Sequence, residues 1–317
     1  MKNIKSIYDK MKKENLVWFD GNIIPQSEAK INILSPTSQF GANAFEGIRG
    51  YWNDKNQQLY IFRLADHTKR LLNSIKMMRF EDKYSSEYLI ESLIDTVIKN
   101  NYKEDIAIRQ TVFLDGNGSW FATSPINMFI APIVKKRMVT KDENGLNCCV
   151  SSWERINDNS LSPKIKVGAN YMNSRAGQLE AIRNGYDFPV FLNDAGKVSE
   201  GPGACIFMIR DNVLITPPTT ASILESITRE TIIELAKNEL NMKVEVRDVD
   251  RTELYISDEL FFCGTAVEVV QIISMDKIKI GTGKIGKHTK SIIDEYFKIV
   301  RGENNKYLHY LTPIKND

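Results

Sequence analysis

One polar, basic stretch divides this chain into two parts that are each long enough to form a domain. Residues 135–145 carry lysine, arginine, asparagine and glycine between apolar segments on either side. At 317 residues the chain exceeds the length that a single core typically needs. We therefore predict an N-terminal domain over residues 1–134 and a C-terminal domain over residues 146–317, joined by an interdomain loop over residues 135–145.

Both parts mix helix-type and strand-type patterns. Apolar residues recur at helical spacing over residues 64–78, 87–98, 170–184, 227–238 and 288–300. Strand patterns and hairpin turns occupy residues 16–22, 54–63, 105–114, 127–133, 147–153 and 189–217. This mixture predicts two α/β (α+β) domains, and small-molecule sites commonly lie between such domains.

The charge and the cysteines narrow the class of partner. The net charge is +2, from 42 Lys and Arg against 40 Asp and Glu, so it favours neither nucleic acid nor an anionic membrane surface. The N-terminus has no apolar signal core, and no later apolar run is long enough to span a bilayer. The four cysteines lack disulfide or zinc spacing, and the three histidines form no metal-ligand cluster. We expect a cytoplasmic protein with no metal, a small-molecule ligand, and a buried free thiol for at least one of Cys148 and Cys149, which would alternate across a strand.

Two short segments of the second part carry the chemistry of a cofactor site. They read Lys166-Val-Gly-Ala-Asn-Tyr171 and Val198-Ser-Glu200-Gly-Pro-Gly203. A lysine amine among apolar residues can form a Schiff base with an aldehyde, and a tyrosine hydroxyl can hydrogen-bond a ring oxygen beside it. The carboxylate of Glu200 can keep a ring nitrogen protonated. Together these groups indicate pyridoxal 5'-phosphate (PLP), which acts as an electron sink.

In this order the two segments resemble the fold-type IV PLP enzymes, and most closely the branched-chain amino acid aminotransferases. The resemblance runs from Trp18-Phe-Asp-Gly21 to the last helix. It implies the two-domain fold of those enzymes and a homodimer, in which N-terminal residues of one subunit reach the other's site. Lys164 lies on the same face of the extended segment and competes for the catalytic role. We choose Lys166 because it immediately precedes Val-Gly-x-Asn-Tyr.

The resemblance also implies a set of cofactor contacts. Arg70 matches an arginine that binds the cofactor phosphate, and its planar fork suits that role. Leu224-Glu-Ser-Ile-Thr228 matches a segment that opens a helix, where unpaired N–H groups favour phosphate. Glu225 and Ser226 replace the family's Pro and Gly there. The implied cofactor-binding residues are Arg70, Lys166, Tyr171, Glu200, Leu224, Ile227, Thr228 and Thr265.

The substrate residues implied in the same way are Phe40, Phe45, Arg109, Thr265 and Ala266. Arg109 matches an arginine that receives the side-chain carboxylate of glutamate or 2-oxoglutarate. Phe40 and Ala107 stand where the family has tyrosines, and residues 133–138 lack its aromatic residue. These changes alter the shape and polarity of the side-chain pocket. We expect ping-pong transamination of a branched-chain L-amino acid with 2-oxoglutarate. A bulkier or more polar amino acid is the alternative.

Four other functions have sequence features to weigh. D-amino acid transamination and aminodeoxychorismate lyase share the lysine and the glutamate, but Phe45-Glu-Gly-Ile-Arg49 favours the branched-chain group. A non-catalytic PLP-binding paralogue is a further alternative, against which Lys166 and Glu200 argue. Gly281-Thr-Gly-Lys-Ile-Gly286 matches a nucleotide motif, but neither the Ser or Thr of a P-loop nor a βαβ unit follows it. It predicts a turn into the last helix.

Overall fold

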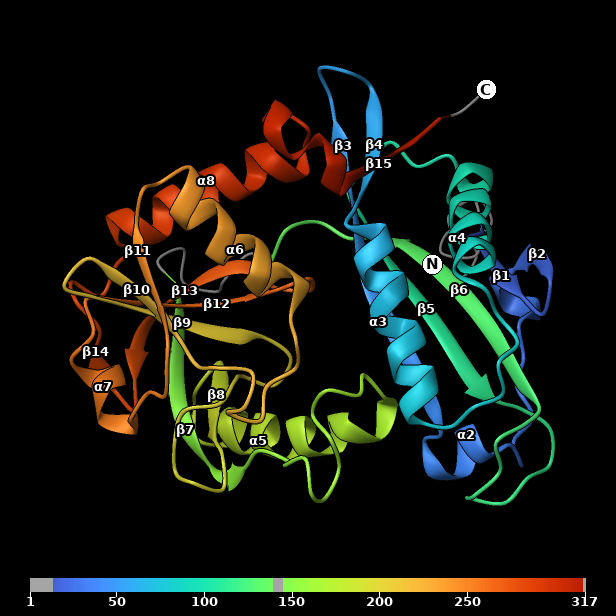
Figure 1. The fold of residues 1–317 in the computed structure, drawn as a ribbon, viewed down its shortest axis with the longest axis horizontal. Helices are drawn as coiled ribbons and strands as arrows, with labels where there is room; N and C mark the ends of the chain where they lie inside the picture. The colour runs from blue at the N-terminus through green and yellow to red at the C-terminus, as the bar shows by residue number, and fades with distance from the viewer. Residues whose placement is uncertain (1–13, 139–144, 316–317) are drawn as a thin grey trace, which may run out of the picture.

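The computed structural model describes residues 14–138 and 145–315, and each half of the molecule is built on one β-sheet (Figure 1). The first sheet is antiparallel throughout, in the order β15-β4-β3-β5-β6-β1-β2. Its strands are β1 (Leu16–Phe19), β2 (Asn22–Pro25), β3 (Asn43–Asn53), β4 (Gln58–Phe62), β5 (Ile106–Leu114), β6 (Ile126–Val134) and β15 (Leu311–Ile314).

The second sheet is mixed, in the order β11-β10-β9-β12-β13-β7-β8, with β14 paired to β13. Strand β7 runs parallel to β8 and β13, and β10 runs parallel to β11. The strands are β7 (Leu146–Glu154), β8 (Phe188–Leu192), β9 (Cys205–Arg210), β10 (Val213–Thr216), β11 (Lys243–Val246), β12 (Glu259–Gly264), β13 (Glu268–Met275) and β14 (Ile278–Lys279).

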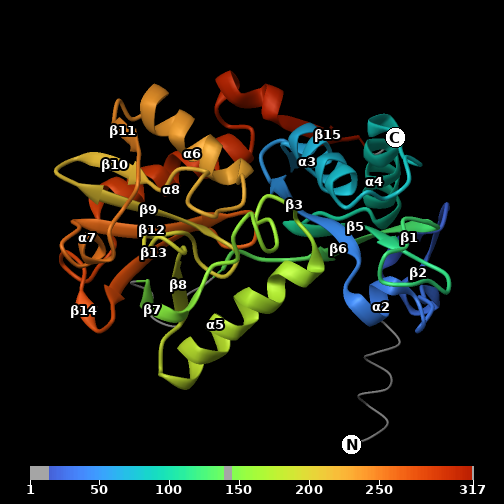
Figure 2. The same ribbon diagram turned by 60° about the horizontal axis from the view of Figure 1, so that its bottom comes forward.

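Helices pack against both sheets. The α-helices are α2 (Pro36–Phe40), α3 (Leu64–Met77), α4 (Ser86–Asn100), α5 (Tyr171–Arg183), α6 (Ile227–Asn238), α7 (Arg251–Tyr255) and α8 (Lys287–Val300). The 3-10 helices are η1 (Gln26–Glu28), η2 (Gly168–Asn170) and η3 (Asn305–Tyr310). Helices α3 and α4 pack on the first sheet, α6 and α8 pack on the second, and α5 packs on β7 and β8 (Figure 2).

Local chemistry explains why the main helices begin where they do. The side chain of Ser85 caps α4 by accepting from the N–H of Tyr88 at 3.2 Å, and Ser226 caps α6 in the same way. The apolar side of α3 and α4 then supplies buried residues such as Leu71 and Leu93 to the first core. The helices predicted from apolar spacing are confirmed as α3, α4, α5, α6 and α8.

The chain end returns to the first half. Strand β15 pairs with β4, whereas the prediction placed residues 146–317 together in the second domain. The strand is short and contains Pro313, which suits an edge strand and leaves a weak signal in the sequence. Residues 139–144 of the predicted interdomain loop lie outside the described residues, and the domain limits stay a prediction.

Two smaller predictions can be compared directly. Hairpins expected over residues 189–217 are correct for β9 and β10, but β8 pairs in parallel with β7. The predicted turn over residues 281–286 does lead into α8. There the carboxylate of Glu259 accepts from the N–H of Thr289 at 2.7 Å, so a protein carboxylate occupies the start of that helix.

The remaining composition-based expectations concern thiols, membranes and metals. All four cysteines are free and buried, which confirms the buried free thiol predicted for at least one of Cys148 and Cys149. Across residues 14–138 and 145–315, no helix has the length and apolar character needed to cross a membrane. The same residues contain no group of three or more His, Cys, Asp or Glu side chains arranged to hold a metal ion.

Candidate active site

A cavity of about 860 Å³ is lined by residues of both sheets and of α5. It brings together most of the residues singled out in the sequence, namely Phe45, Arg70, Arg109, Lys166, Tyr171, Glu200, Leu224, Thr265 and Ala266. Phe40, Ile227 and Thr228 do not line it, and neither does Lys164. Of the two competing lysines, only Lys166 therefore faces the cavity.

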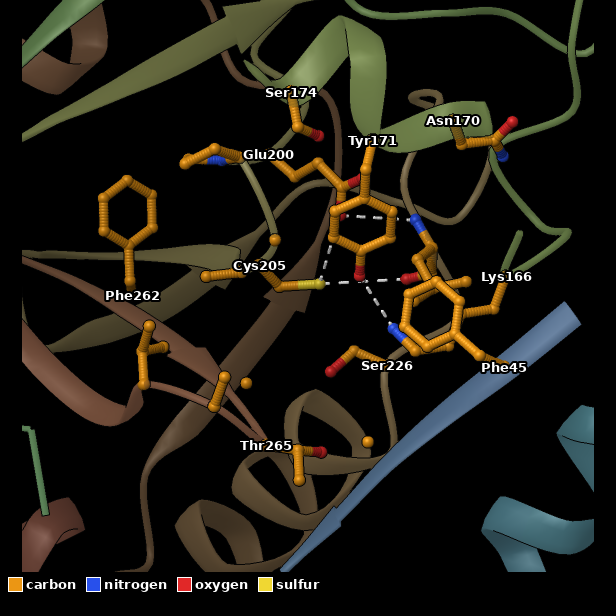
Figure 3. Close-up of a pocket in the computed structure, with 18 of the residues that line it drawn as sticks. Phe45, Lys166, Asn170, Tyr171, Ser174, Glu200, Cys205, Ser226, Phe262 and Thr265 are labelled. Atoms are coloured by element: carbon orange, nitrogen blue, oxygen red, sulfur yellow. Dashed lines mark hydrogen bonds between the residues drawn. The ribbon is translucent and has the colours of Figure 1, made fainter. Parts of the chain in front are cut away.

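The backbone around Lys166 is held between β3 and α3. Its N–H donates to the Ser74 hydroxyl at 3.1 Å, and its carbonyl accepts from the N–H of Phe45 at 2.9 Å. Its amine donates to the hydroxyl of Tyr171 at 3.0 Å (Figure 3). The rings of Phe45 and Tyr171 lie 5.2 Å apart, centroid to centroid, beside that amine. The lysine is thus aimed into the cavity with a hydroxyl as its immediate partner.

Glu200 is buried, with 3% of its surface exposed, in the turn that leads into β9. Its carboxylate lies 2.7 Å from the guanidinium of Arg155 and accepts from the N–H of Leu224 at 3.3 Å. Burial raises the pKa of Glu200, and Arg155 opposes that rise. A Cβ on Gly201 would come within 2.8 Å of the Phe262 ring, so only glycine lets this turn approach the sheet.

Arg70 reaches the cavity from α3 and is held by a buried glutamate. Its guanidinium donates to both carboxylate oxygens of Glu46, at 2.7 and 2.8 Å, and to the carbonyl of Glu225 at 2.8 Å. Burial would raise the pKa of Glu46, but Arg70 and His67 hold it well below its usual value. His67 lies 2.7 Å from the same carboxylate, so its ring is held as a buried structural partner of Glu46.

The start of α6 and the turn after β12 complete the end of the cavity that Arg70 reaches. The hydroxyl of Ser226 accepts from the N–H of Arg229 at 3.2 Å, so the N–H groups of Ile227 and Thr228 are left without an intrahelical acceptor. The side chains of both residues are buried, so only their backbone can serve a ligand. The turn after β12 carries Thr265, which lines the same cavity.

Two predicted substrate residues lie on different surfaces. The guanidinium of Arg109 lies 4.1 Å from the centre of the Phe45 ring, at the floor of the cavity. Burial lowers the pKa of Arg109, and Tyr171 and Glu46 oppose this. Phe40 is 51% exposed at the end of α2, outside the cavity of its own chain. Its substrate role stays a prediction.

Sequence analysis missed Arg155. The residue follows β7 directly, is 8% exposed and donates to the Ser174 hydroxyl at 3.2 Å as well as pairing with Glu200. The signal that could have found it is electrostatic, because a buried glutamate that works as an anion requires a cation nearby. Cys205, whose thiol lies 3.9 Å from the Glu200 carboxylate, was noted only as a cysteine.

These groups fit PLP by their chemistry. The Lys166 amine suits the aldehyde, the Tyr171 hydroxyl suits the neighbouring ring oxygen, and the Glu200 carboxylate suits the ring nitrogen. Arg70 and the free N–H groups at the start of α6 suit a phosphate. The cavity therefore supplies a matched partner for each functional group of the cofactor.

Comparison with known proteins gives the family. A model of the family described as amino-transferase class IV matches residues 43–275. A probable branched-chain-amino-acid aminotransferase of Aquifex aeolicus is 38% identical over 305 residues, 95% of this chain and 97% of the relative. The structure of a branched-chain amino acid aminotransferase from Thermobaculum terrenum in its PLP form superposes with a TM-score of 0.90, at 39% identity, over 96% of this chain and 100% of that one.

A third similarity bears on the ligand. A branched-chain amino acid aminotransferase of T.th., complexed with N-(5'-phosphopyridoxyl)-L-glutamate, has a TM-score of 0.89 at 33% identity, and the match covers 96% of this chain and 99% of that one. Fold, cavity and sequence therefore agree along nearly the whole length. On this evidence the chain belongs to the class IV aminotransferase family.

Proposed function

We propose that this protein is a PLP-dependent aminotransferase that moves the amino group of a branched-chain L-amino acid to 2-oxoglutarate. The observation that carries the proposal is one cavity in which the amine of Lys166 contacts Tyr171 while the buried carboxylate of Glu200 faces the same space. Relatives named as branched-chain-amino-acid aminotransferases, similar over nearly their full length, support the substrate class.

Each residue has a defined task. When bound, PLP withdraws electrons from the substrate Cα and carries the amino group between the two half-reactions. The Lys166 amine removes the Cα proton and returns a proton there in the reverse half-reaction, and the Tyr171 hydroxyl orients that amine. Arg155 lies 2.7 Å from the Glu200 carboxylate and lowers its pKa against the effect of burial. Arg109 offers its guanidinium to the second carboxylate of the acidic partner.

The test is a steady-state assay of the PLP-loaded protein with a panel of 2-oxo acids. We expect activity with the 2-oxo acids of leucine, isoleucine and valine, with glutamate as donor. Because one site accepts both substrates in turn, double-reciprocal plots should be parallel. Intersecting lines would exclude the ping-pong scheme. A product with inverted configuration at Cα, or release of pyruvate from aminodeoxychorismate, would instead favour the other activities of this fold.

We further propose that the protein is a cytoplasmic homodimer. Four buried free thiols support a reducing compartment. An apolar face formed by the loop before α2, by α2 and by the loop before β6 supports self-association, and its exposed residues are Ile33, Leu34, Phe40, Trp120 and Phe121. The two loops are joined there by a hydrogen bond from Asn32 to Asn117 of 2.8 Å.

Sedimentation velocity tests the homodimer. Leu34→Asp places a charge in this apolar face and should shift the protein from dimer to monomer. Ile256→Asp is the matched control, because Ile256, directly after α7 in the other half, is 60% exposed. A wild-type monomer, or equal behaviour of the two variants, would contradict the assignment of this face.

A further inference from the structure

The floor of the cavity is a row of alternate residues from three neighbouring strands of the first sheet. Because side chains alternate between the faces of a sheet, the residues on the cavity face recur at every second position, and Ile48 and Ile108 between them also border the cavity. They are Phe45, Gly47 and Arg49 on β3, Ala107 and Arg109 on β5, and Ala131, Ile133 and Lys135 on and just after β6. This row contains three cations and several very small side chains.

The strand register places an open space at Ala107. Ala107 pairs with Arg49 on one side and with Ile133 on the other. Arg109 lies two residues further along the same strand. The N–H of Lys135 donates to the carbonyl of Asp105 at 2.9 Å, which puts Lys135 diagonally across from Ala107, within reach of a long side chain. The methyl side chain of Ala107 therefore lies among three cationic residues on this face of the sheet.

Among the residues that the structure describes, only one of these three cations is neutralised by a protein carboxylate. Arg49 is buried and lies 3.0 Å from Glu268, whose second oxygen lies 4.0 Å from Arg137. Within residues 14–138 and 145–315, neither Arg109 nor Lys135 has a carboxylate at ion-pair distance. The Arg109 guanidinium rests on the Phe45 ring instead.

Keeping these cations together is electrostatically costly. Burial lowers the pKa of Lys135, and Arg49 and Arg109 act in the same direction, while the charge of Glu268 opposes them. Like charges in a partly desolvated site repel one another, and an anion between them would relieve that repulsion. A purely apolar side chain over Ala107 would instead strip water from unpaired charges without replacing it.

We propose that Lys135 joins Arg109, to which the proposed function already assigns the second carboxylate of the acidic partner, and that the two cations form an anion subsite which holds this carboxylate over Ala107. This inference rests on the proposed aminotransferase function and names the substrate class of its acidic half-reaction. Ala107 lies two strand residues, roughly 7 Å, beyond Arg109. The subsite therefore accepts six-carbon dicarboxylates such as 2-oxoadipate as well as five-carbon ones.

The test compares two neighbouring lysines in the PLP-loaded enzyme. Lys135→Gln removes the proposed ligand, whereas Lys136→Gln removes the same charge from an exposed residue that does not line the cavity. The assay measures KM for 2-oxoglutarate, 2-oxoadipate and 4-methyl-2-oxopentanoate with one common donor. A lost hydrogen bond to a charged group predicts that Lys135→Gln raises both dicarboxylate KM values about 10- to 100-fold. KM for the monocarboxylate should change less than about twofold, and Lys136→Gln should resemble wild type.

A binding measurement separates this inference from the proposed function. Calorimetric titration with adipate and with 4-methylpentanoate, which cannot react, reports the subsite whether or not the protein turns over. We expect Lys135→Gln to lose at least about tenfold in affinity for adipate only. If wild type transfers no amino group yet shows this selective loss, the proposed function fails and the subsite stands. If the two lysine variants behave alike, or all ligands weaken equally, the subsite is wrong.

Discussion

The cofactor end of the cavity and its floor are built in contrasting ways. At the cofactor end Lys166, Glu200 and Arg70 each have a side-chain partner within about 3 Å, and Glu200 and Arg70 are held by further bonds. At the floor several side chains are very small, Arg49 pairs with Glu268, and Arg109 and Lys135 have no carboxylate partner among the described residues.

This contrast separates reaction from specificity. Groups held by several buried bonds are preorganised, and moving any one of them leaves another charge or dipole unpaired. Floor residues such as Ala107 and Ala131 anchor nothing and can change with little effect on folding. Changes at the cofactor end should therefore affect all substrates equally, whereas changes at the floor should alter the ratio between substrates.

The largest effect is expected at Lys166. Lys166→Ala removes the amine that contacts Tyr171, so kcat should fall by at least about 10³-fold for every substrate pair. Lys164→Ala is the matched control, since Lys164 does not line the cavity, and it should keep nearly wild-type kcat. Single-turnover assays of both variants provide the measurement. Loss of activity in the Lys164 variant alone would reverse the assignment.

The next largest effect is expected at Arg155. Arg155→Met leaves the Glu200 carboxylate buried without its cation, and the free energy of unfolding should fall by about 3–5 kcal/mol. Arg183→Met changes an exposed arginine at the end of α5 and should cost less than about 0.5 kcal/mol. Urea unfolding of both variants gives the difference. Equal stability of the two variants would show that the pair contributes nothing.

The stability that Arg155→Met loses should depend on pH with a definite sign. The pKa of Glu200 is raised in the folded protein, so the native state holds its proton more tightly than the unfolded chain does. Stability contributed by this group therefore falls as pH rises from the ordinary value through the raised one. Without Arg155 the pKa rises further, so the variant should lose more stability at about pH 8 than at about pH 5. The opposite trend would contradict the pairing.

A smaller effect is expected in the turn after Glu200. A Cβ at position 201 would come 2.8 Å from the Phe262 ring, whereas one at position 203 would lie 3.8 Å from Tyr171. Gly201→Ala should lower the free energy of unfolding by about 1–3 kcal/mol through overpacking, and cofactor affinity should fall with it. Gly203→Ala should change stability by less than about 0.5 kcal/mol. Thermal unfolding with and without PLP measures both effects.

The sequence allowed the cofactor end to be predicted because its chemistry is local. Lys166 and Tyr171 lie close together in the chain, and Glu200 is followed by two glycines, so short motifs carry the information. The helices were predictable for the same reason, since apolar spacing along α3 or α6 depends on near neighbours.

Features that depend on long-range pairing were not predictable. Arg155 approaches Glu200 only after β7 and the turn before β9 have come together, and no local pattern marks it. The return of β15 to the first sheet and the cation row beside Ala107 depend on strand register in the same way. The sequence showed that Ala107 departs from the family, but only the register shows which charges surround it.

The smallest effect is expected at that floor. Ala107→Val and Ala107→Thr add nearly equal volume over the open space, so both should lower kcat/KM for 2-oxoadipate, by about tenfold or less. The threonine hydroxyl can donate to a carboxylate, whereas the second methyl of valine cannot, so the threonine variant should lose less. The unfolding free energy and kcat for 4-methyl-2-oxopentanoate should stay close to wild type, because Ala107 anchors no other residue. Kinetics with both 2-oxo acids provide the measurement. An equal loss for the two substrates would mean that the floor belongs to the catalytic framework and would remove the contrast between the two ends of the cavity.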